Sequence, residues 1–176
     1  SSRSVGLSIG GLFAAQVMER DVVAEGLVLI NTLRKPSLRL DWINEATART
    51  FAIGGRKLLL DLMAPVLINP ETLSEMRPDA MINDDYVVTS VEDGHMNLMR
   101  NAALADWDFS WEKLSVPTLV MTGLHDRVFL VEEDVLQLSN HIPNLTTVNF
   151  HDAGHLVPVE RPERFTDQLL NFLEAL

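Results

Sequence analysis

Two continuous apolar runs constrain the fold of this chain more than any other feature of its sequence. Residues 26–31 read GLVLIN and residues 116–123 read VPTLVMTG. Apolar runs of this length, bounded by Gly, Asn or Pro, are typical of strands buried on both faces, as in a parallel sheet. With a short apolar strand end before Ser8 and the β-branched run LTTVNF, the sequence predicts four strands. They end near Leu7, Asn31, Thr122 and Phe150.

Helical patterns separate these strands. Compact apolar spacing follows the first strand at residues 10–18, a second helix is expected at 132–140, and residues 160–176 form an amphipathic pattern with a charged outer face. Strands that alternate with helices indicate an α/β fold, in which helices cover both faces of a parallel sheet.

The long segment between the second and third strands has a different character. Residues 32–108 contain four prolines and apolar residues at helical spacing, so we expect several short helices and no strands. The segment is too long for a plain loop and should form a packed subdomain. The predicted organisation is therefore an α/β core from residues 1–31 and 109–176, with a helical subdomain at 32–108.

Composition excludes several classes of function. The chain has 14 basic and 25 acidic residues, a net charge of −11, which argues against nucleic-acid binding and favours a neutral substrate over an anionic one. There is no cysteine, which excludes a disulfide scaffold, a thiolate nucleophile and a cysteine zinc site, and fits a cytoplasmic location. We find no metal-ligand spacing. No apolar run approaches the roughly 18 residues of a membrane span, so no membrane association is expected.

The segment Gly6-Leu7-Ser8-Ile9-Gly10 has the form G-x-S-x-G. It lies between an apolar strand end and a helix, where a sharp turn exposes a nucleophilic serine and flanking glycines give the turn room. The N–H groups at the start of the following helix can then stabilise a developing oxyanion. Ser8 is therefore the candidate nucleophile.

Asp126 and His155 each follow a predicted strand, at the carboxyl ends where catalytic groups of parallel sheets collect. Taken alone, Asp126 could be a turn aspartate that bonds the local backbone, and His155 a surface-loop histidine. His151 competes as a base but lies closer to the strand, and so is less able to reach Ser8. The three candidates gain weight together, because each follows its own strand.

The chain resembles the α/β-hydrolase family, in which the catalytic residues also follow the chain order Ser, Asp, His. The segments that carry the resemblance are VGLSIGGLFAAQ, GLVLINT, PTLVMTGLHDRV and DAGHLVPVERPERF, and together they span nearly the whole chain. The last is quite specific, because Glu160, Pro162 and Phe165 follow Gly154-His155. A serine at the nucleophile position disfavours the branches that use aspartate, and no nucleotide-binding glycine motif is present.

The resemblance implies a serine hydrolase that acts on a carboxylic ester or lactone, without a cofactor. In this family His155 would take the proton of Ser8, Asp126 would orient the imidazole, and the backbone N–H of Ile9 would bind the oxyanion. The sequence is similar to esterases and enol-lactone hydrolases. Carbon–carbon bond hydrolases share the same skeleton and stay open as an alternative.

Residues 32–108 resemble the helical cap that covers the active site in this family. Methionines adapt to irregular apolar ligands, so Met63, Met96 and Met99, together with Trp107, are candidate pocket residues for a small neutral or hydrophobic substrate. Ordinary packing within the cap is the alternative for each of them.

The chain departs from the family in one respect. Family members place several strands before the serine, whereas Ser8 lies near the start of this sequence. We therefore expect the C-terminal part of an α/β-hydrolase fold: either a fragment, or a chain whose sheet is completed by a second chain or a second copy. The second oxyanion donor would lie in the missing part, so weak activity of the chain alone is expected. A non-catalytic ligand-binding protein and an inactive fragment remain alternatives.

Overall fold

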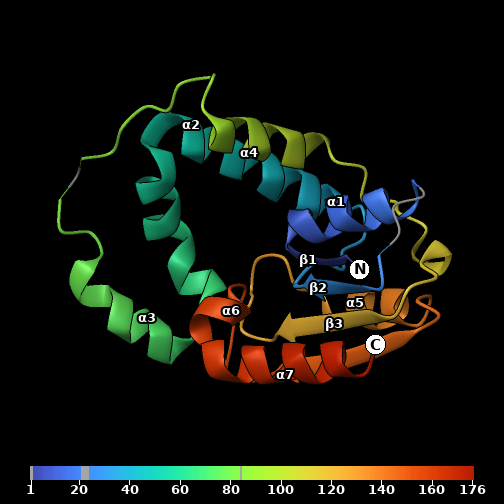
Figure 1. Ribbon diagram of the computed structural model, residues 1–176. Helices are drawn as coiled ribbons and strands as arrows, with labels where there is room; N and C mark the ends of the chain where they lie inside the picture. Colours follow the sequence, from blue (N-terminus) through green and yellow to red (C-terminus); the bar gives the residue numbers. More distant parts are fainter. Residues whose placement is uncertain (1, 21–23, 84) are drawn as a thin grey trace.

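A four-stranded parallel sheet forms the centre of the computed structural model, which describes residues 2–20, 24–83 and 85–176 (Figure 1). The strands are adjacent in chain order and all pairs are parallel, which confirms the predicted α/β sheet. Their carboxyl ends are level, since Leu7 pairs with Ile30, Ile30 with Met121, and Gly123 with Phe150. The strands are β1 (Arg3–Leu7), β2 (Gly26–Ile30), β3 (Thr118–Gly123) and β4 (Leu145–Phe150).

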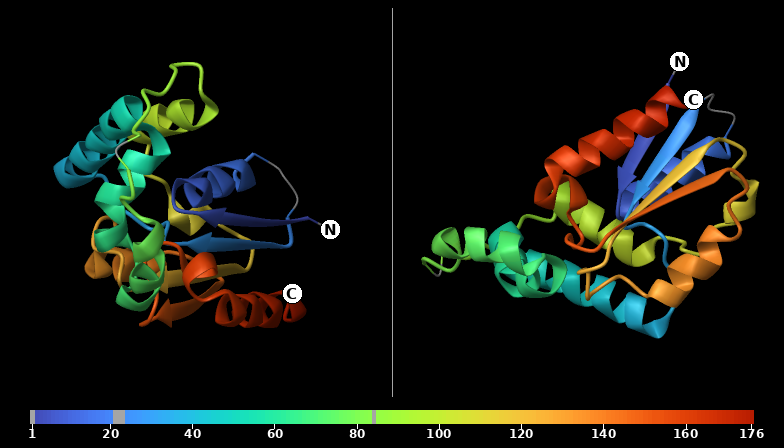
Figure 2. Two further views of the ribbon diagram at one scale, coloured as in Figure 1. Left: turned by 90° about the vertical axis from the view of Figure 1, so that its left-hand side faces the viewer. Right: turned by 90° about the horizontal axis from the view of Figure 1, so that it is seen from below.

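The continuous apolar run of β2 is explained by burial on both faces. Leu27 and Leu29 pack into a core with α1 (Ile9–Met18) and α5 (Glu132–Ser139). Val28 and Ile30 point the other way, into a second core that contains Phe172 of α7 (Pro162–Glu174). In Figure 1 and the left view of Figure 2, α1 and α7 accordingly lie on opposite sides of the sheet.

Every element assigned between β2 and β3, within the described residues, is helical. Side chains cap three of the helices at their N-termini: Ser37, Asn69 and Asp93 each accept hydrogen bonds from N–H groups of the first turn. This helical segment lies over the carboxyl ends of the strands (Figures 1 and 2). Its elements are α2 (Leu38–Leu67), α3 (Pro70–Met76), the 3₁₀ turn η1 (Arg77–Asp79) and α4 (Gly94–Leu104); the 3₁₀ turn η2 (Trp111–Lys113) follows this segment and precedes β3.

The segment labelled α2, residues 38–67, consists of two helical stretches that meet at a kink, in agreement with the expectation of several helices between β2 and β3. Pro65 lies in the last turn of the second stretch, which ends at Leu67. The bend is at Gly55, whose φ of 65° and ψ of −165° are not helical. The first half of α2 packs against α4 through Ala48, Phe51 and Met96.

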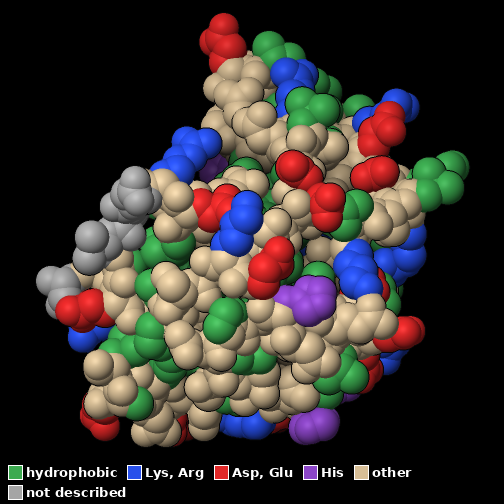
Figure 3. Space-filling model, turned by 90° about the vertical axis from the view of Figure 1, so that its right-hand side faces the viewer, with side chains coloured by type: hydrophobic (Ala, Val, Ile, Leu, Met, Phe, Trp, Pro, Cys, Tyr) green, Lys and Arg blue, Asp and Glu red, His purple; other side chains and the backbone are tan. Residues whose placement is uncertain are grey.

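The acidic surplus of the chain forms no large patch on one face of the molecule. On the face shown in Figure 3, Asp and Glu side chains are scattered among Lys and Arg and form no single-sign patch. Among the residues that the structure describes, no helix has the length and apolar character needed to cross a membrane.

Gly55 provides a test of the bend in α2. Its backbone conformation is one that only glycine adopts without strain, so Gly55→Ala should lower the free energy of unfolding by about 1–3 kcal/mol. Gly94→Ala is the matched control: nothing lies within 4 Å of an added Cβ there, and alanine in a helix should be neutral or stabilising. Urea unfolding followed by circular dichroism measures both. Equal effects of the two substitutions would contradict a strained bend at Gly55.

Candidate active site

Ser8 lies in the turn that joins β1 to α1, in a strained backbone conformation with φ of 55° and ψ of −126°. Its N–H donates to the carbonyl of Ile30 at 2.8 Å, and its carbonyl accepts from Gly11 N–H at 3.1 Å and from Thr32 Oγ1 at 2.9 Å. These bonds hold the strained residue between the ends of β1 and β2. Ile9, the first residue of α1, has its N–H in the first helical turn, where N–H groups have no intrahelical partner.

Close packing at this turn depends on Gly6 and Gly11. A Cβ at Gly6 would lie 2.3 Å from the Cα of Gly11, and a Cβ at Gly11 would lie 2.0 Å from Thr32 Oγ1. Gly10, by contrast, has nothing within 4 Å of an added Cβ. Of the two glycines in the G-x-S-x-G motif, the turn therefore requires Gly6, whereas a side chain would fit at Gly10.

Asp126 and His155 are in direct contact. Nδ1 of His155 lies 2.6 Å from Oδ2 of Asp126, and both side chains are buried. The other oxygen of Asp126 accepts N–H bonds from Val128 and Phe129 at 3.0 and 2.9 Å. With Nδ1–H donating to the carboxylate, the second ring nitrogen of His155 is left as an acceptor. This is the arrangement that a general base requires.

Hydrogen bonds control the charge of Asp126. Burial on its own would raise the pKa of the Asp126 carboxyl. The hydrogen bond and the charge of His155, together with the N–H groups of Phe129 and Val128, outweigh burial and hold this pKa below its usual value. Asp126 is therefore ionised at neutral pH.

Ser8 and His155 line the same cavity, but Ser8 Oγ bonds elsewhere. It accepts a hydrogen bond from Nη2 of Arg34 at 2.6 Å. Within the described residues, no hydrogen bond joins Ser8 to His155. The structure thus brings together Asp126 and His155, and places Ser8 beside them with a different partner. His151 is exposed and does not line the cavity.

Arg34 lines this cavity and is buried, with 5% of its surface exposed. Its guanidinium lies between the rings of Trp107 and Phe129, at 4.8 and 4.1 Å from their centroids. Burial lowers the pKa of Arg34 to about 10, and the nearby carboxylate of Asp126 opposes this shift. Arg34 therefore stays charged at neutral pH.

The cavity has a volume of about 330 Å³, which is within the range of small-molecule sites. Most of its wall is aliphatic and comes from α2 and α4. Met63, Met99 and Trp107 are among its lining residues. Met96 is not: it is buried between α2 and α4 against Ala48 and Phe51, because it lies on the face of α4 that packs on α2. The structure gives Met96 a packing role in place of the expected pocket role.

The buried carboxylate of Glu160 holds the His155 loop. Its Oε2 accepts from the backbone N–H of Gly154 at 2.8 Å, and its Oε1 from that of Leu156 at 2.9 Å, on either side of His155. The same Oε2 also accepts from the backbone and side-chain nitrogens of Asn69, at 2.8 and 2.7 Å. Glu160 ends the short helix α6 (Val157–Glu160), so it joins this helix to both the His155 loop and the start of α3.

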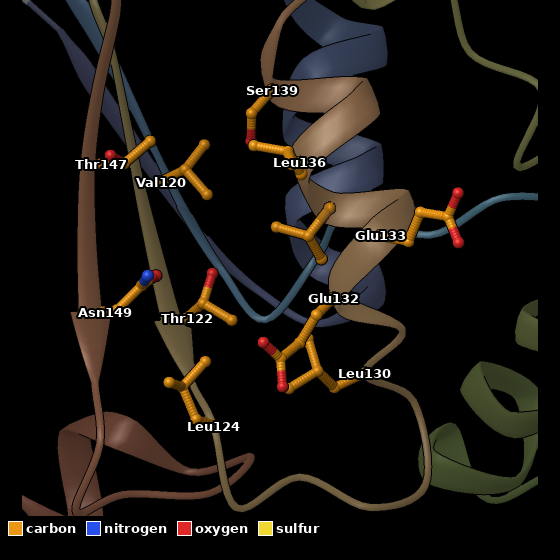
Figure 4. Close-up of a pocket in the computed structure, with 11 residues that line it drawn as sticks. Val120, Thr122, Leu124, Leu130, Glu132, Glu133, Leu136, Ser139, Thr147 and Asn149 are labelled. Carbon is orange, nitrogen blue, oxygen red and sulfur yellow. The ribbon is translucent and has the colours of Figure 1, made fainter.

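A second cavity, of about 390 Å³, lies between α5 and the strands β3 and β4 (Figure 4). Val120 and Thr122 of β3 face Leu136 and Ser139 of α5 across it. Neither Ser8 nor His155 lines this cavity, so it is separate from the candidate site. In the described part of the chain, no group of three or more His, Asp or Glu side chains is arranged to hold a metal ion.

Sequence reasoning missed two residues of the site, Asn31 and Arg34. Asn31 has a positive φ of 46°, and its side chain accepts from Gly123 N–H at 2.8 Å and donates to Asp126 at 3.4 Å. A polar residue at the carboxyl end of a buried strand was the available signal for Asn31. Arg34 carried no such signal, because an arginine just after a strand reads as a surface residue.

Substitution of Glu160 tests its control of the His155 loop. Glu160→Gln replaces one acceptor oxygen by a donor amide against N–H groups, so the free energy of unfolding should fall by about 3 kcal/mol. Glu163→Gln, on the exposed first turn of α7, is the matched control and should change it little. Urea unfolding measures both. A loss no greater than that of the control would show that the four hydrogen bonds do not stabilise the fold.

The lowered pKa of Asp126 predicts a pH-dependent contribution to stability. Asp126 binds a proton less readily in the folded than in the unfolded chain, whose pKa is about 3.9. Its stabilisation is therefore complete above that value and is lost as the pH falls through the lower folded pKa. Asp126→Asn should lower the free energy of unfolding at pH 7, and its gap to the unsubstituted protein should narrow below about pH 4. Urea titrations from pH 7 to 3, with Asp167→Asn on the exposed face of α7 as control, measure this; a constant gap would refute it.

Two enzymes of known structure and one further protein are similar to this chain. An esterase from Thermogutta terrifontis, solved with malate bound, superposes with a TM-score of 0.78 and 26% identity, over 98% of this chain and 64% of that one. The enol-lactonase from Burkholderia xenovorans LB400 gives a TM-score of 0.74 and 26% identity, over 97% of this chain and 64% of that one. Protein ABHD14A of Rattus norvegicus is 38% identical over 66 residues, which are 38% of this chain and 26% of that protein.

The chain therefore spans less than two thirds of the length of these proteins. The similarity to the two solved enzymes nevertheless includes the sheet, the helices on both of its faces and the helical segment above the strand ends, since it extends over nearly all of this chain. A family model described as the alpha/beta hydrolase family matches residues 4–168. The chain belongs to the alpha/beta hydrolase family.

Proposed function

We propose that this chain carries the catalytic groups of a serine hydrolase that cleaves a carboxylic ester or lactone through an acyl-enzyme. The observation that carries the proposal is the 2.6 Å contact between Nδ1 of His155 and Oδ2 of Asp126, at a cavity that both His155 and Ser8 line. The similarity to an esterase and an enol-lactonase supports the same class of reaction. Because the chain spans 64% of those enzymes, the activity and substrates of the whole protein are part of this proposal.

In the first half of the reaction, Ser8 Oγ forms a bond to the carbonyl carbon and its proton passes to Nε2 of His155. Asp126 stabilises the imidazolium that results, through the hydrogen bond at Nδ1. The carbon–oxygen bond of the substrate then breaks, and the leaving alcohol takes the proton from His155. In this proposal the backbone N–H of Ile9, at the start of α1, donates a hydrogen bond to the developing oxyanion.

In the second half, His155 takes a proton from water, which attacks the acyl carbon. The bond between that carbon and Ser8 Oγ breaks, Ser8 recovers its proton from His155, and the carboxylic acid leaves. Ser8 Oγ must exchange Arg34 for His155 before the first step, since it is bonded to Arg34 in this structure. In this proposal a rotation of the Ser8 side chain makes the exchange, and catalytic hydrogen bonds commonly tighten only when substrate binds.

The substrate class follows from the wall of the cavity. Aliphatic side chains of α2 and α4, with Met63 and Met99, would hold a hydrophobic acyl or alcohol group. In this proposal residues 32–108 act as the cap of the site and determine substrate choice. A carbon–carbon bond hydrolase would use the same Ser8 and His155 chemistry with a different leaving group.

A non-catalytic ligand-binding protein is the second candidate. The hydrogen bond between Ser8 and Arg34 favours it, because a serine held by a cation has no base at its hydroxyl. An inactive fragment, like a binding protein, would hydrolyse no ester in an activity assay. Labelling of the serine is therefore the more useful measurement.

Fluorophosphonate labelling separates these candidates, using the protein as its source produces it. A hydrolase should be labelled at Ser8, with no labelling in Ser8→Ala and much weaker labelling in His155→Ala. Ester turnover in either variant should fall by a factor on the order of 10⁴–10⁶. The matched controls are Ser74→Ala and His141→Ala, both exposed and outside the cavity, which should keep full labelling. A folded protein that is not labelled would favour the binding protein.

A further inference from the structure

The cavity contains a permanent positive charge in an otherwise uncharged wall. Among its described lining residues, Arg34 is the one with a permanent charge, and no Asp or Glu lines the cavity. Its guanidinium is held in one orientation by two aromatic faces and by Nη2 bonds to Ser8 Oγ at 2.6 Å and to the carbonyl of Asn31 at 3.1 Å. A fixed cation of this kind is a specific feature in a site that otherwise recognises aliphatic groups.

The hydrogen-bonding capacity of Arg34 is only partly used. Its Nε is buried without a partner, and within the described residues Nη1 makes no hydrogen bond. The nearest counter-charge, Asp126, is already engaged by His155 and two backbone N–H groups. A buried charge with no ionic partner is costly, and burial has already lowered the pKa of Arg34. The planar fork of a guanidinium matches a carboxylate better than any neutral acceptor.

We propose that Arg34 binds a carboxylate of the substrate, so that the enzyme acts on an ester or lactone which also carries a free acid group. The inference rests on the proposed hydrolase function and deepens it by naming the substrate class. It departs from the neutral substrate expected from the net charge of −11, because the net charge describes the whole chain whereas the cavity itself holds a cation and no carboxylate.

The position of Arg34 sets the distance between the two groups of the substrate. The attacked carbonyl carbon must come within about 3–3.5 Å of Ser8 Oγ, and a carboxylate oxygen within about 3 Å of the guanidinium. Since Nη2 of Arg34 lies 2.6 Å from that same Oγ, only a few carbon atoms separate the acid group from the attacked carbonyl. Half-esters of short dicarboxylic acids and lactones with a short acid side chain have this spacing.

Binding of the carboxylate also accounts for activation of the nucleophile. Arg34 holds Ser8 Oγ in the unliganded structure, and a carboxylate competes for the same Nη2. When the carboxylate takes over Nη2, Ser8 Oγ is released to bond with His155, which lines the same cavity. An ester without the acid group lacks this means of displacing Ser8.

Monomethyl glutarate and methyl pentanoate test the proposal, because their acyl chains are equally long and differ in the free acid. Proton release on hydrolysis gives kcat/KM for each. The ratio of the two values should favour monomethyl glutarate and should fall about 100-fold in Arg34→Met. Arg34→Lys, which keeps the charge but loses the fork, should give an intermediate ratio. Arg49→Met, at an exposed arginine paired with Glu45 on α2, is the matched control and should leave the ratio unchanged.

Two outcomes of this assay would overturn the proposal. An equal fall of both kcat/KM values in Arg34→Met would mean that Arg34 positions Ser8 without reading the substrate. No change in either kcat/KM value would mean that the cation does not contact the acid group. If circular dichroism shows that Arg34→Met does not fold, the same comparison is made with Arg34→Lys, where an unchanged ratio again overturns the proposal.

Ligand binding to Ser8→Ala separates this inference from the hydrolase function, because it needs no turnover. Trp107 lies on the guanidinium of Arg34, so its fluorescence should report occupancy. Monomethyl glutarate should give a saturable change that Arg34→Met removes, and the neutral dimethyl glutarate should give none. Equal binding of both esters would refute the acid-binding role, even in a protein labelled by fluorophosphonate. Selective binding without labelling would refute the hydrolase and keep the acid-binding site.

Discussion

The carboxylate of Glu160 connects the parts of this structure that have to meet at the site. It accepts N–H bonds from Gly154 and Leu156, and so fixes the backbone on both sides of His155. It also accepts two bonds from Asn69, which follows directly after α2 and caps α3. One buried charge therefore sets where the His155 loop stands relative to the helices that form the cavity wall.

The same helical segment supports the loop a second time. The N–H of His155 donates to the carbonyl of Leu67, at the C-terminal end of α2, with a distance of 2.7 Å. The neighbouring Arg127, just after Asp126, donates its N–H to Val66. The end of α2 thus receives hydrogen bonds from both loops that carry the acid–base pair. Movement of α2 would consequently change the cavity wall and also shift the loops that hold Asp126 and His155.

The sheet could be predicted from the sequence because a strand buried on both faces appears as a continuous apolar run. Leu27, Val28, Leu29 and Ile30 alternate between two cores, so every position in β2 must be apolar. The carboxyl ends of such strands are level in a parallel sheet, which is why Asp126 and His155 could be brought together from their positions in the chain.

The helical segment was harder to predict, because helical spacing does not tell which partner a face will meet. Met63, Met96 and Met99 are all methionines of this helical segment. Met63 and Met99 line the cavity, whereas Met96 lies on the face of α4 that packs on α2. Arg34 was missed for a different reason: its burial depends on two aromatic rings, from Trp107 and Phe129, that come from distant segments.

Asn31 explains why two opposite charges can lie so close without neutralising each other. Its carbonyl accepts from Arg34 at 3.1 Å and its side-chain amide donates to Asp126 at 3.4 Å, so it stands between them as a neutral spacer. A direct ion pair would turn Asp126 away from His155 and would occupy the guanidinium fork. Because the two charges are held apart, the carboxylate can orient the imidazole while the cation lines the cavity. Asn31 holds this position with a left-handed backbone, φ of 46°, a conformation that asparagine adopts more readily than most residues.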